Sequence, residues 1–362
     1  MRALIPLLCL ALPVTTAVAQ SSDQPPRSEV ELVDTLDQDN LQEAIRILLR
    51  SYIKRDNLDS LELNRSALQG LLDRSGFGVA LVDRKSEVDE SSDPQQLVAE
   101  SLSDSVCYLR PGTFSDPELG EISQQLRKFE AAGSKTLILD LRVPAREATF
   151  ESAARVLDHF CPPDQLLFKI QKPGEDQPSL FLSKSARGWD GELIVLIDAQ
   201  TPPASEAIAT VLKRMRAPLL VGHRTPGKTV EYEKVIISEE AYLRFAVAEL
   251  VFADDGSIFR TGLKPDLEVE LGVADKSYIF SSSREEGMKS FVFSKQQPRL
   301  NEAALVAGTN PELDYAIAHS AGRDTGYDTV PIHDRVVQAA LDYLVTAELL
   351  GSTVGSSHEN PE

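Results

Sequence analysis

The feature that most constrains the fold of this chain is an alternation of short apolar runs with amphipathic segments between residues 104 and 222. The run 136–141 is almost wholly apolar, as expected for a strand that is covered on both faces. Strands are predicted at 105–109, 136–141, 165–170, 192–198 and 218–222, and helices at 117–132, 150–160 and 203–215. Because strands that alternate with helices build parallel sheets, the sequence predicts an α/β fold with helices packed on a largely parallel sheet.

Hydrophobic periodicity predicts further elements outside this region. They are, in chain order, helices over 41–52 and 58–72, a strand over 241–252, a loop region over 285–330 and a helix over 333–350. Composition divides the chain into six parts: a signal peptide (1–19), a flexible leader (20–38), an N-terminal helical segment with a linker (39–103), an α/β core (104–272), a C-terminal loop region with the terminal helix (273–350) and a disordered tail (351–362).

The first nineteen residues have the composition of a secretory signal. Arg2 supplies a positive charge, an apolar run extends from Ala3 to Val14, and Ala17-Val18-Ala19 is an A-x-A cleavage site. Cys9 lies inside the apolar run and not at its end, so lipid attachment is not expected there. The sequence therefore predicts an exported protein, periplasmic or extracellular, that is cleaved after Ala19 and has no membrane span.

Charge and motifs exclude several function classes. The chain has 37 Lys and Arg against 56 Asp and Glu, a formal net charge of −19, so nucleic acids and anionic membranes are poor partners. The C-x-x-C, H-E-x-x-H and G-x-G-x-x-G patterns are absent, and no metal and no cofactor are expected. Cys107 and Cys161 remain after signal cleavage, and an exported compartment allows them either to pair or to stay buried thiols.

Four blocks in the expected order resemble the C-terminal processing (tail-specific) serine peptidases, which use a Ser-Lys dyad. The blocks are the L-I-L-D-L-R strand at 137–142, the segment 193–206 that ends in P-A-S-E, the run L-V-G-H-R-T-P-G-K at 220–228 and the run G-L-K-P-D-L-E-V at 262–269. The resemblance implies an N-terminal helical segment followed by a layered α/β core like that of ClpP and crotonase. It also implies serine peptidase chemistry on polypeptides.

The dyad itself is incomplete in this sequence. In the family, the first residue of an S-A-S-E run attacks the peptide carbonyl, and the lysine of a G-K pair takes the proton. That lysine acts only where burial leaves it neutral. The resemblance places the base at Lys228, directly after Gly227, and the nucleophile at Pro203, which has no hydroxyl. The nucleophile is therefore predicted to be lost.

Two further departures accompany the loss of the serine. After L-D-L-R the family carries a glycine-rich turn that lets the backbone approach the substrate carbonyl, whereas residues 143–148 contain no glycine. The family also usually carries a PDZ module after the front helices, and residues 76–103 are too few for one. Together these changes predict a peptidase-like fold without peptidase chemistry.

Three functions remain open. The first is an exported pseudo-peptidase that binds a polypeptide segment or a protein partner, and self-association into a homo-oligomer is left open. The second is an active serine-type peptidase in which Ser205 or Thr201 attacks and Lys228 is the base. Against it, Ser205 would lie about 200° around a helix from position 203, and Thr201 is expected to be the helix N-cap. The third is an α/β domain that binds no polypeptide.

The other polar residues in these blocks have structural interpretations. Glu206 either orients Lys228 or is favoured in a first helical turn by the helix dipole. Asp140 and Arg142 are expected to form an internal ion pair at the end of a strand. His223 is the histidine that lies inside one of the family-like blocks, and it is a candidate for acid–base chemistry.

Overall fold

The computed structural model describes residues 28–85, 96–143, 148–175, 177–184, 188–292, 309–321 and 332–351. The chain forms two compact units, residues 1–71 and residues 72–362. The predicted signal peptide, the predicted tail after residue 351 and most of the turn at 143–148 lie outside the described residues.

The first unit is helical. It contains α1 (Glu29–Asp34), α2 (Gln38–Ser51), the short 3₁₀ helix η1 (Arg55–Asn57) and most of α3 (Ser60–Ser75). α1 begins with a capping box, in which Ser28 and Glu31 each accept a hydrogen bond from the other's amide. Asp37 caps α2 by accepting from the amide of Asn40. The helices predicted over 41–52 and 58–72 are confirmed, and α1 lies within the stretch that was expected to be a flexible leader.

The second unit is built on a six-stranded sheet in the order β11-β8-β7-β4-β3-β2. Its strands are β2 (Val98–Ser101), β3 (Val106–Arg110), β4 (Thr136–Asp140), β7 (Glu192–Ile197), β8 (Leu219–Gly222) and β11 (Leu267–Glu268). β2 runs antiparallel to β3, and the other four pairs are parallel. All residues of β3 and β4 are buried, as their continuous apolar sequences predict.

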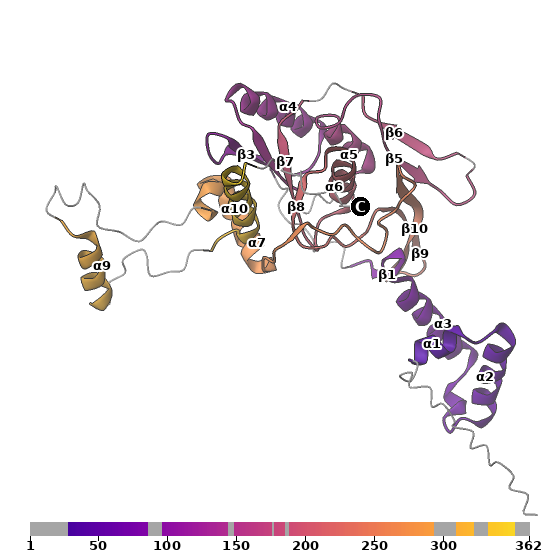
Figure 1. Ribbon diagram of the computed structural model, residues 1–362. Coiled ribbons are helices and arrows are strands. Elements are labelled where there is room, and N and C mark those ends of the chain that lie inside the picture. Colours follow the sequence, from indigo (N-terminus) through magenta and orange to yellow (C-terminus); the bar gives the residue numbers. More distant parts are fainter. Residues whose placement is uncertain are drawn as a thin grey trace, which may run out of the picture. The chain divides into compact units, whose positions relative to one another are not determined.

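Helices cover both faces of this sheet (Figure 1). On one face α4 (Asp116–Ala131), α5 (Phe150–Leu157) and α6 (Pro203–Arg216) share a core with Leu139 and Val195. On the other face α7 (Val273–Glu286) and α10 (Arg335–Leu349) share a core with Ile138 and Ile194. Because successive strand residues point to opposite faces, β4 and β7 contribute to both cores. The predicted layered α/β fold is therefore confirmed.

The second unit also contains an antiparallel sheet. It consists of β1 (Val79–Asp83), β5 (Leu166–Gln171), β6 (Ser179–Leu182), β9 (Val230–Ile236) and β10 (Ala241–Phe252). β10 matches the strand predicted over 241–252 and pairs with β1, β5 and β9. Its register with β9 shifts between Ala246 and Ala248, which marks a β-bulge. The predicted strand at 165–170 therefore belongs to this sheet and not to the parallel one.

The sequence prediction is least accurate in the C-terminal region. It missed α7, and it assigned a loop to the stretch that holds η3 (Met288–Phe291) and α9 (Pro311–Ser320). The buried side chains of α7 include Lys276 and Ser283 together with Ile279 and Phe280. The inner face of α7 is thus partly polar, and it lacks the regular apolar repeat by which surface helices are predicted.

The two cysteines of the second unit, Cys107 and Cys161, are buried and form no disulfide. Burial raises the pKa of Cys107 to about 12, so this thiol stays protonated at neutral pH. Of the two alternatives left open by the sequence, the structure has the buried thiols.

Candidate functional site

The predicted nucleophile position lies at the start of α6, after the central strand β7. Pro203 is the first residue of the helix, and Pro202 is its N-cap. Thr201, which was expected to be the N-cap, is fully buried and bonds to Asp198 instead. Its hydroxyl accepts from the Asp198 amide at 2.8 Å and donates to Asp198 Oδ1 at 3.3 Å. The N-cap prediction is wrong because this local turn uses the hydroxyl.

Ser205, the alternative nucleophile, is the third residue of α6. Its side chain is only 1% exposed, whereas Pro203 is half-buried. Because α6 is a continuous α-helix from Pro203 to Arg216, the two side chains lie on nearly opposite sides of the helix. Ser205 thus does not occupy the place of Pro203.

The predicted base, Lys228, lies in the loop between β8 and β9 and is half-buried. Its ammonium nitrogen lies 5.0 Å from the centroid of the Phe77 ring, a cation–π contact. Among the described residues, no hydrogen bond joins this amine to the hydroxyl of Ser205 or Thr201. The structure therefore has no hydrogen-bonded pair of Lys228 with either candidate hydroxyl among the described residues.

Glu206 connects α6 to the loop that carries Lys228. Its buried carboxylate accepts from the amide of Gly227 at 2.6 Å and from the amide of Lys228 at 2.7 Å. Burial raises the pKa of Glu206, although hydrogen bonds from Thr225 and from these two amides act in the opposite direction. Of the two interpretations of Glu206, the structure agrees better with orientation of Lys228, because the carboxylate binds the backbone amide of Lys228.

Two glycines let the family-like blocks pack closely at this loop. Gly227 has φ +74°, and a Cβ there would lie 2.5 Å from the amide nitrogen of Gly262. Gly262 has φ +66°, and its Cβ would lie 1.9 Å from the carbonyl oxygen of Thr225. Residues with side chains rarely adopt such φ values. Gly227 of the G-K pair and Gly262, which begins the 262–269 block, are therefore required for this close packing.

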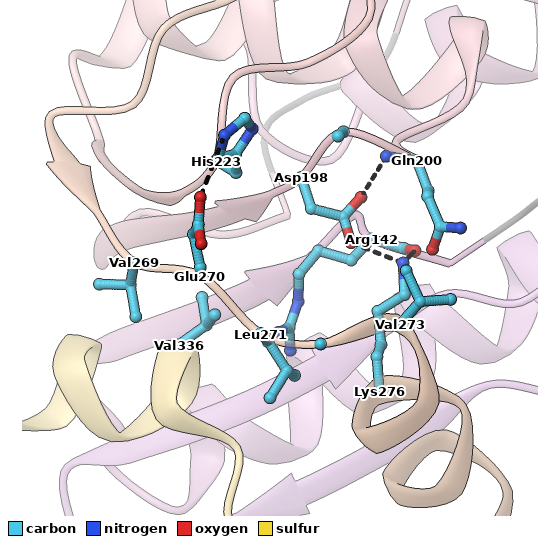
Figure 2. A pocket seen from close by; sticks show the side chains of 12 residues that line it. Arg142, Asp198, Gln200, His223, Val269, Glu270, Leu271, Val273, Lys276 and Val336 are labelled. Carbon is cyan, nitrogen blue, oxygen red and sulfur yellow. Dashed lines mark hydrogen bonds and ion pairs between the residues drawn. The ribbon is translucent and has the colours of Figure 1, made fainter.

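A pocket of about 250 Å³ opens at the carboxyl ends of the parallel strands (Figure 2). Residues 198–200 follow β7, His223 follows β8, and residues 269–273 follow β11, while Arg142, Lys276 and Val336 complete the lining. The carboxyl edge of a parallel sheet is where α/β proteins bind ligands. None of the described residues that line the pocket carries a hydroxyl or a thiol. A serine- or cysteine-type nucleophile is therefore not found among the described residues of this pocket.

Two contacts between ionisable side chains face this pocket. The Lys276 ammonium donates to Asp198 Oδ2 at 2.5 Å and to the Arg142 carbonyl at 3.3 Å. On the other side His223 Nε2 lies 3.7 Å from Glu270 Oε1, as Figure 2 shows. His223 thus lines a pocket and lies next to a carboxylate. No described residue of that pocket carries a hydroxyl or a thiol that His223 could activate.

Behind the pocket a buried charge network joins β4 to α10. The Arg142 guanidinium donates to both oxygens of Asp140 and to both oxygens of Asp334, and Tyr108 donates to Asp140 at 2.7 Å. Although burial alone would raise it, the neighbouring Arg142 holds the pKa of Asp140 below its usual range. The predicted structural pair of Asp140 and Arg142 is confirmed. Asp334, which also binds Arg142 in this network, was not predicted from the sequence.

The structure also limits other kinds of site. No helix in the described ranges is long and apolar enough to cross a bilayer. Within the same part of the chain, no three His, Cys, Asp or Glu side chains are grouped to hold a metal ion.

Comparison with known proteins agrees with the order of the blocks. Residues 105–269 match the model of peptidase family S41. The chain is 27% identical over 166 residues to the carboxyl-terminal-processing protease of Synechocystis sp., covering 46% of this chain and 38% of that protein. It is 23% identical over 268 residues to the carboxy-terminal processing protease CtpA of Bacillus subtilis, covering 73% of this chain and 53% of that protein. Over residues 105–269 the chain is therefore similar to peptidase family S41.

The S41 segment extends from β3 to β11, so it contains both Pro203 and Lys228, whereas α7 and α10 lie outside it. A solved structure of a putative peptidase from Parabacteroides merdae has the same fold, with a TM-score of 0.50 and 15% identity over 67% of this chain and 85% of that chain. The chain spans between about two fifths and one half of the length of the two processing proteases that it matches.

Proposed function

We propose that this protein is an exported, catalytically inactive relative of the C-terminal processing peptidases that binds unfolded polypeptide. One observation carries the proposal: the residue at the start of α6, where the S41 resemblance implies the attacking serine, is Pro203. A proline side chain has neither a hydroxyl nor a thiol. When catalytic groups act as a unit, removal of one of them abolishes nearly all of the rate enhancement.

The surroundings of the remaining groups support this proposal over an active peptidase. The side-chain nitrogen of Lys228 lies over the face of Phe77, 5.0 Å from the ring centroid, and no hydrogen bond joins it to a hydroxyl of Ser205 or Thr201. Ser205 is buried in α6, and the hydroxyl of Thr201 is engaged by Asp198. A relocated nucleophile would need to leave these positions before it could attack.

Polypeptide binding is proposed from the relatives and from one exposed strand. The names of the relatives describe proteases that process carboxyl termini, so their substrates are polypeptides. In this chain β9 pairs only with β10 among the described strands, and its residues 233–236 are exposed. Unpaired edge strands can add an extended peptide through main-chain hydrogen bonds. A pocket of about 340 Å³ beside β9 and β10, lined by Val230, Phe259 and residues 171–175 and 246–249, offers room for peptide side chains.

The proposal also assigns the parts of the chain. Residues 1–19 are assigned as an export signal, on their charge and A-x-A pattern. Residues 104–272 are assigned as the peptidase-like core, which carries the polypeptide-binding surface. Residues 39–103 and 273–350 are assigned as the flanking N-terminal and C-terminal segments.

The experiment measures binding and cleavage of the same labelled, reduced and alkylated polypeptide. We expect the wild type to raise its fluorescence anisotropy and to leave its length unchanged on a gel. Pro203→Ser restores a hydroxyl at the start of α6, and Pro202→Ser is the matched control one residue away. Cleavage by Pro203→Ser alone would indicate that Lys228 keeps a usable base position. Cleavage by the wild type that is lost in Lys228→Ala would refute the proposal.

A further inference from the structure

The exposed edge of β9 has two faces of different charge. Among the described strands β9 pairs only with β10, and its residues 233–236 are exposed. The bulge in this hairpin places its extra residue in β10, so successive side chains of β9 alternate regularly between the two faces of the sheet. One face of β9, called here the acidic face, carries Glu231, Glu233 and Val235. The opposite face carries Lys234.

The carboxylates of the acidic face are hardly neutralised within the fold. Glu233 forms no ion pair and no side-chain hydrogen bond with any described residue. Glu231 lies 4.0 Å from the Lys172 ammonium, but the two side chains are 39% and 45% exposed, and an exposed pair of this kind contributes little. On the opposite face, the Lys234 ammonium lies 5.1 Å from the centroid of the Tyr242 ring. The acidic face therefore offers two negative charges to a ligand at this edge.

The charges of β9 indicate which strand can pair with it. Opposite charges that face each other across two strands stabilise the pair, and like charges destabilise it. A second copy of β9 fits poorly, because the antiparallel registers centred on residues 232, 233 and 234 set Glu231 opposite Glu233, Glu233 opposite Glu233 and Lys234 opposite Lys234. The net charge of −19 favours encounters with positively charged chains. The occupant that fits is a different polypeptide with basic side chains.

We propose that the edge of β9 selects extended polypeptide segments that carry basic residues at alternate positions, an inference that rests on the polypeptide binding proposed above. In the bound segment, two lysine or arginine side chains lie opposite Glu231 and Glu233, and an apolar side chain lies opposite Val235. Main-chain hydrogen bonds to β9 hold any extended segment, and the side-chain pairs decide which segment is preferred. Each opposite-charge pair strengthens binding by about twofold to fivefold.

The test measures binding of short labelled peptides to the full mature chain by fluorescence anisotropy. Three peptides differ only at two alternate positions, which hold lysine, glutamine or glutamate. The lysine peptide is expected to bind most tightly and the glutamate peptide most weakly, and the difference is expected to shrink as the salt concentration rises. A fourth peptide carries the same two lysines at adjacent positions, so only one of them can lie on the acidic face. It is expected to bind about twofold to fivefold more weakly than the peptide with alternate lysines.

Charge reversal on the protein tests whether β9 makes the selection. Glu231→Lys with Glu233→Lys is expected to make the glutamate peptide bind more tightly than the lysine peptide. The matched control is Glu239→Lys with Glu240→Lys, which makes the same change of charge at two exposed residues between β9 and β10. The control is expected to keep the preference for the lysine peptide. Circular dichroism and the Tm establish that both variants are folded.

The outcomes separate this inference from the proposed function. If no peptide binds, the neutral one included, polypeptide binding itself is refuted and the preference with it. If the lysine, glutamine and glutamate peptides bind equally well, polypeptide binding stands and the selection of basic segments is overturned. A preference that survives Glu231→Lys with Glu233→Lys, or that the control variant reverses equally, would overturn the assignment of the selection to the acidic face.

Discussion

Asp334 fastens α10 to the sheet through two different interactions, and its removal is the sharpest test of the buried charge network. Its Oδ1 accepts from the amides of Val336 and Val337, both at 3.1 Å, and so caps α10. The same carboxylate accepts from Arg142 Nη1 at 3.2 Å and from Arg142 Nη2 at 2.7 Å. Both side chains are at most 1% exposed.

Asp334→Ala removes both interactions at once. Loss of the cap costs about 1 kcal/mol. Loss of one carboxylate beside a buried guanidinium costs about 3 kcal/mol, the lower end of the usual range, because Asp140 still pairs with Arg142. The free energy of unfolding is therefore expected to fall by about 4 kcal/mol.

Equilibrium urea unfolding measures this loss, with Thr149→Ala as the control. Thr149 caps α5 in the same unit by accepting from the amide of Ser152 at 3.1 Å, but it is exposed and has no charged partner, so its removal costs about 1 kcal/mol. Asp334→Asn should fall between the two, because it keeps an oxygen for the cap and loses the charge. An Asp334→Ala variant that is destabilised no more than Thr149→Ala would refute the role given to Arg142.

Three further predictions concern the second unit and are measured by the same unfolding titrations. The pKa of Asp140 is lowered in the folded protein, so its contribution to the free energy of unfolding is complete above its unfolded pKa of about 3.8 and is lost as the pH falls through the lower folded value. If Arg142→Met does not lose stability over this pH range, the result would support Arg142 as the cause of the lowered pKa. Gly262→Ala should cost several times more than Gly133→Ala, because both have positive φ but only the first would place a Cβ 1.9 Å from a carbonyl oxygen; equal losses would contradict the close packing. Glu206→Ala should cost about 2–4 kcal/mol, since two amides lose their acceptor, and a neutral result would contradict this.

The main sheet was predictable because its strands carry their own signal. β3, β4 and β7 are continuous apolar runs separated by amphipathic helices, and such runs form parallel strands covered on both faces. β10 was predictable for a similar reason, since twelve residues without glycine or proline precede a turn. The local sequence does not say which sheet a strand joins, and β5 was therefore placed in the wrong one.

The site was predictable only where its chemistry is local in the sequence. Pro203 and Lys228 could be proposed as the dyad positions because each lies in a short block that resembles the peptidase family. Asp334 could not be assigned to Arg142, because 192 residues separate them and only the packing of α10 on the sheet brings them together. Lys276 was missed for the same reason, since its partner Asp198 comes from a different element of the fold.

The loss of the attacking oxygen at position 203 is tested most directly by the mass of the intact protein after incubation with an acylating peptide ester. The wild type is expected to keep its mass, and Pro203→Ser tests whether a hydroxyl at this position is enough for the gain of one acyl group. A wild-type adduct that is lost in Lys228→Ala would contradict the proposal that this S41-like core has no nucleophile.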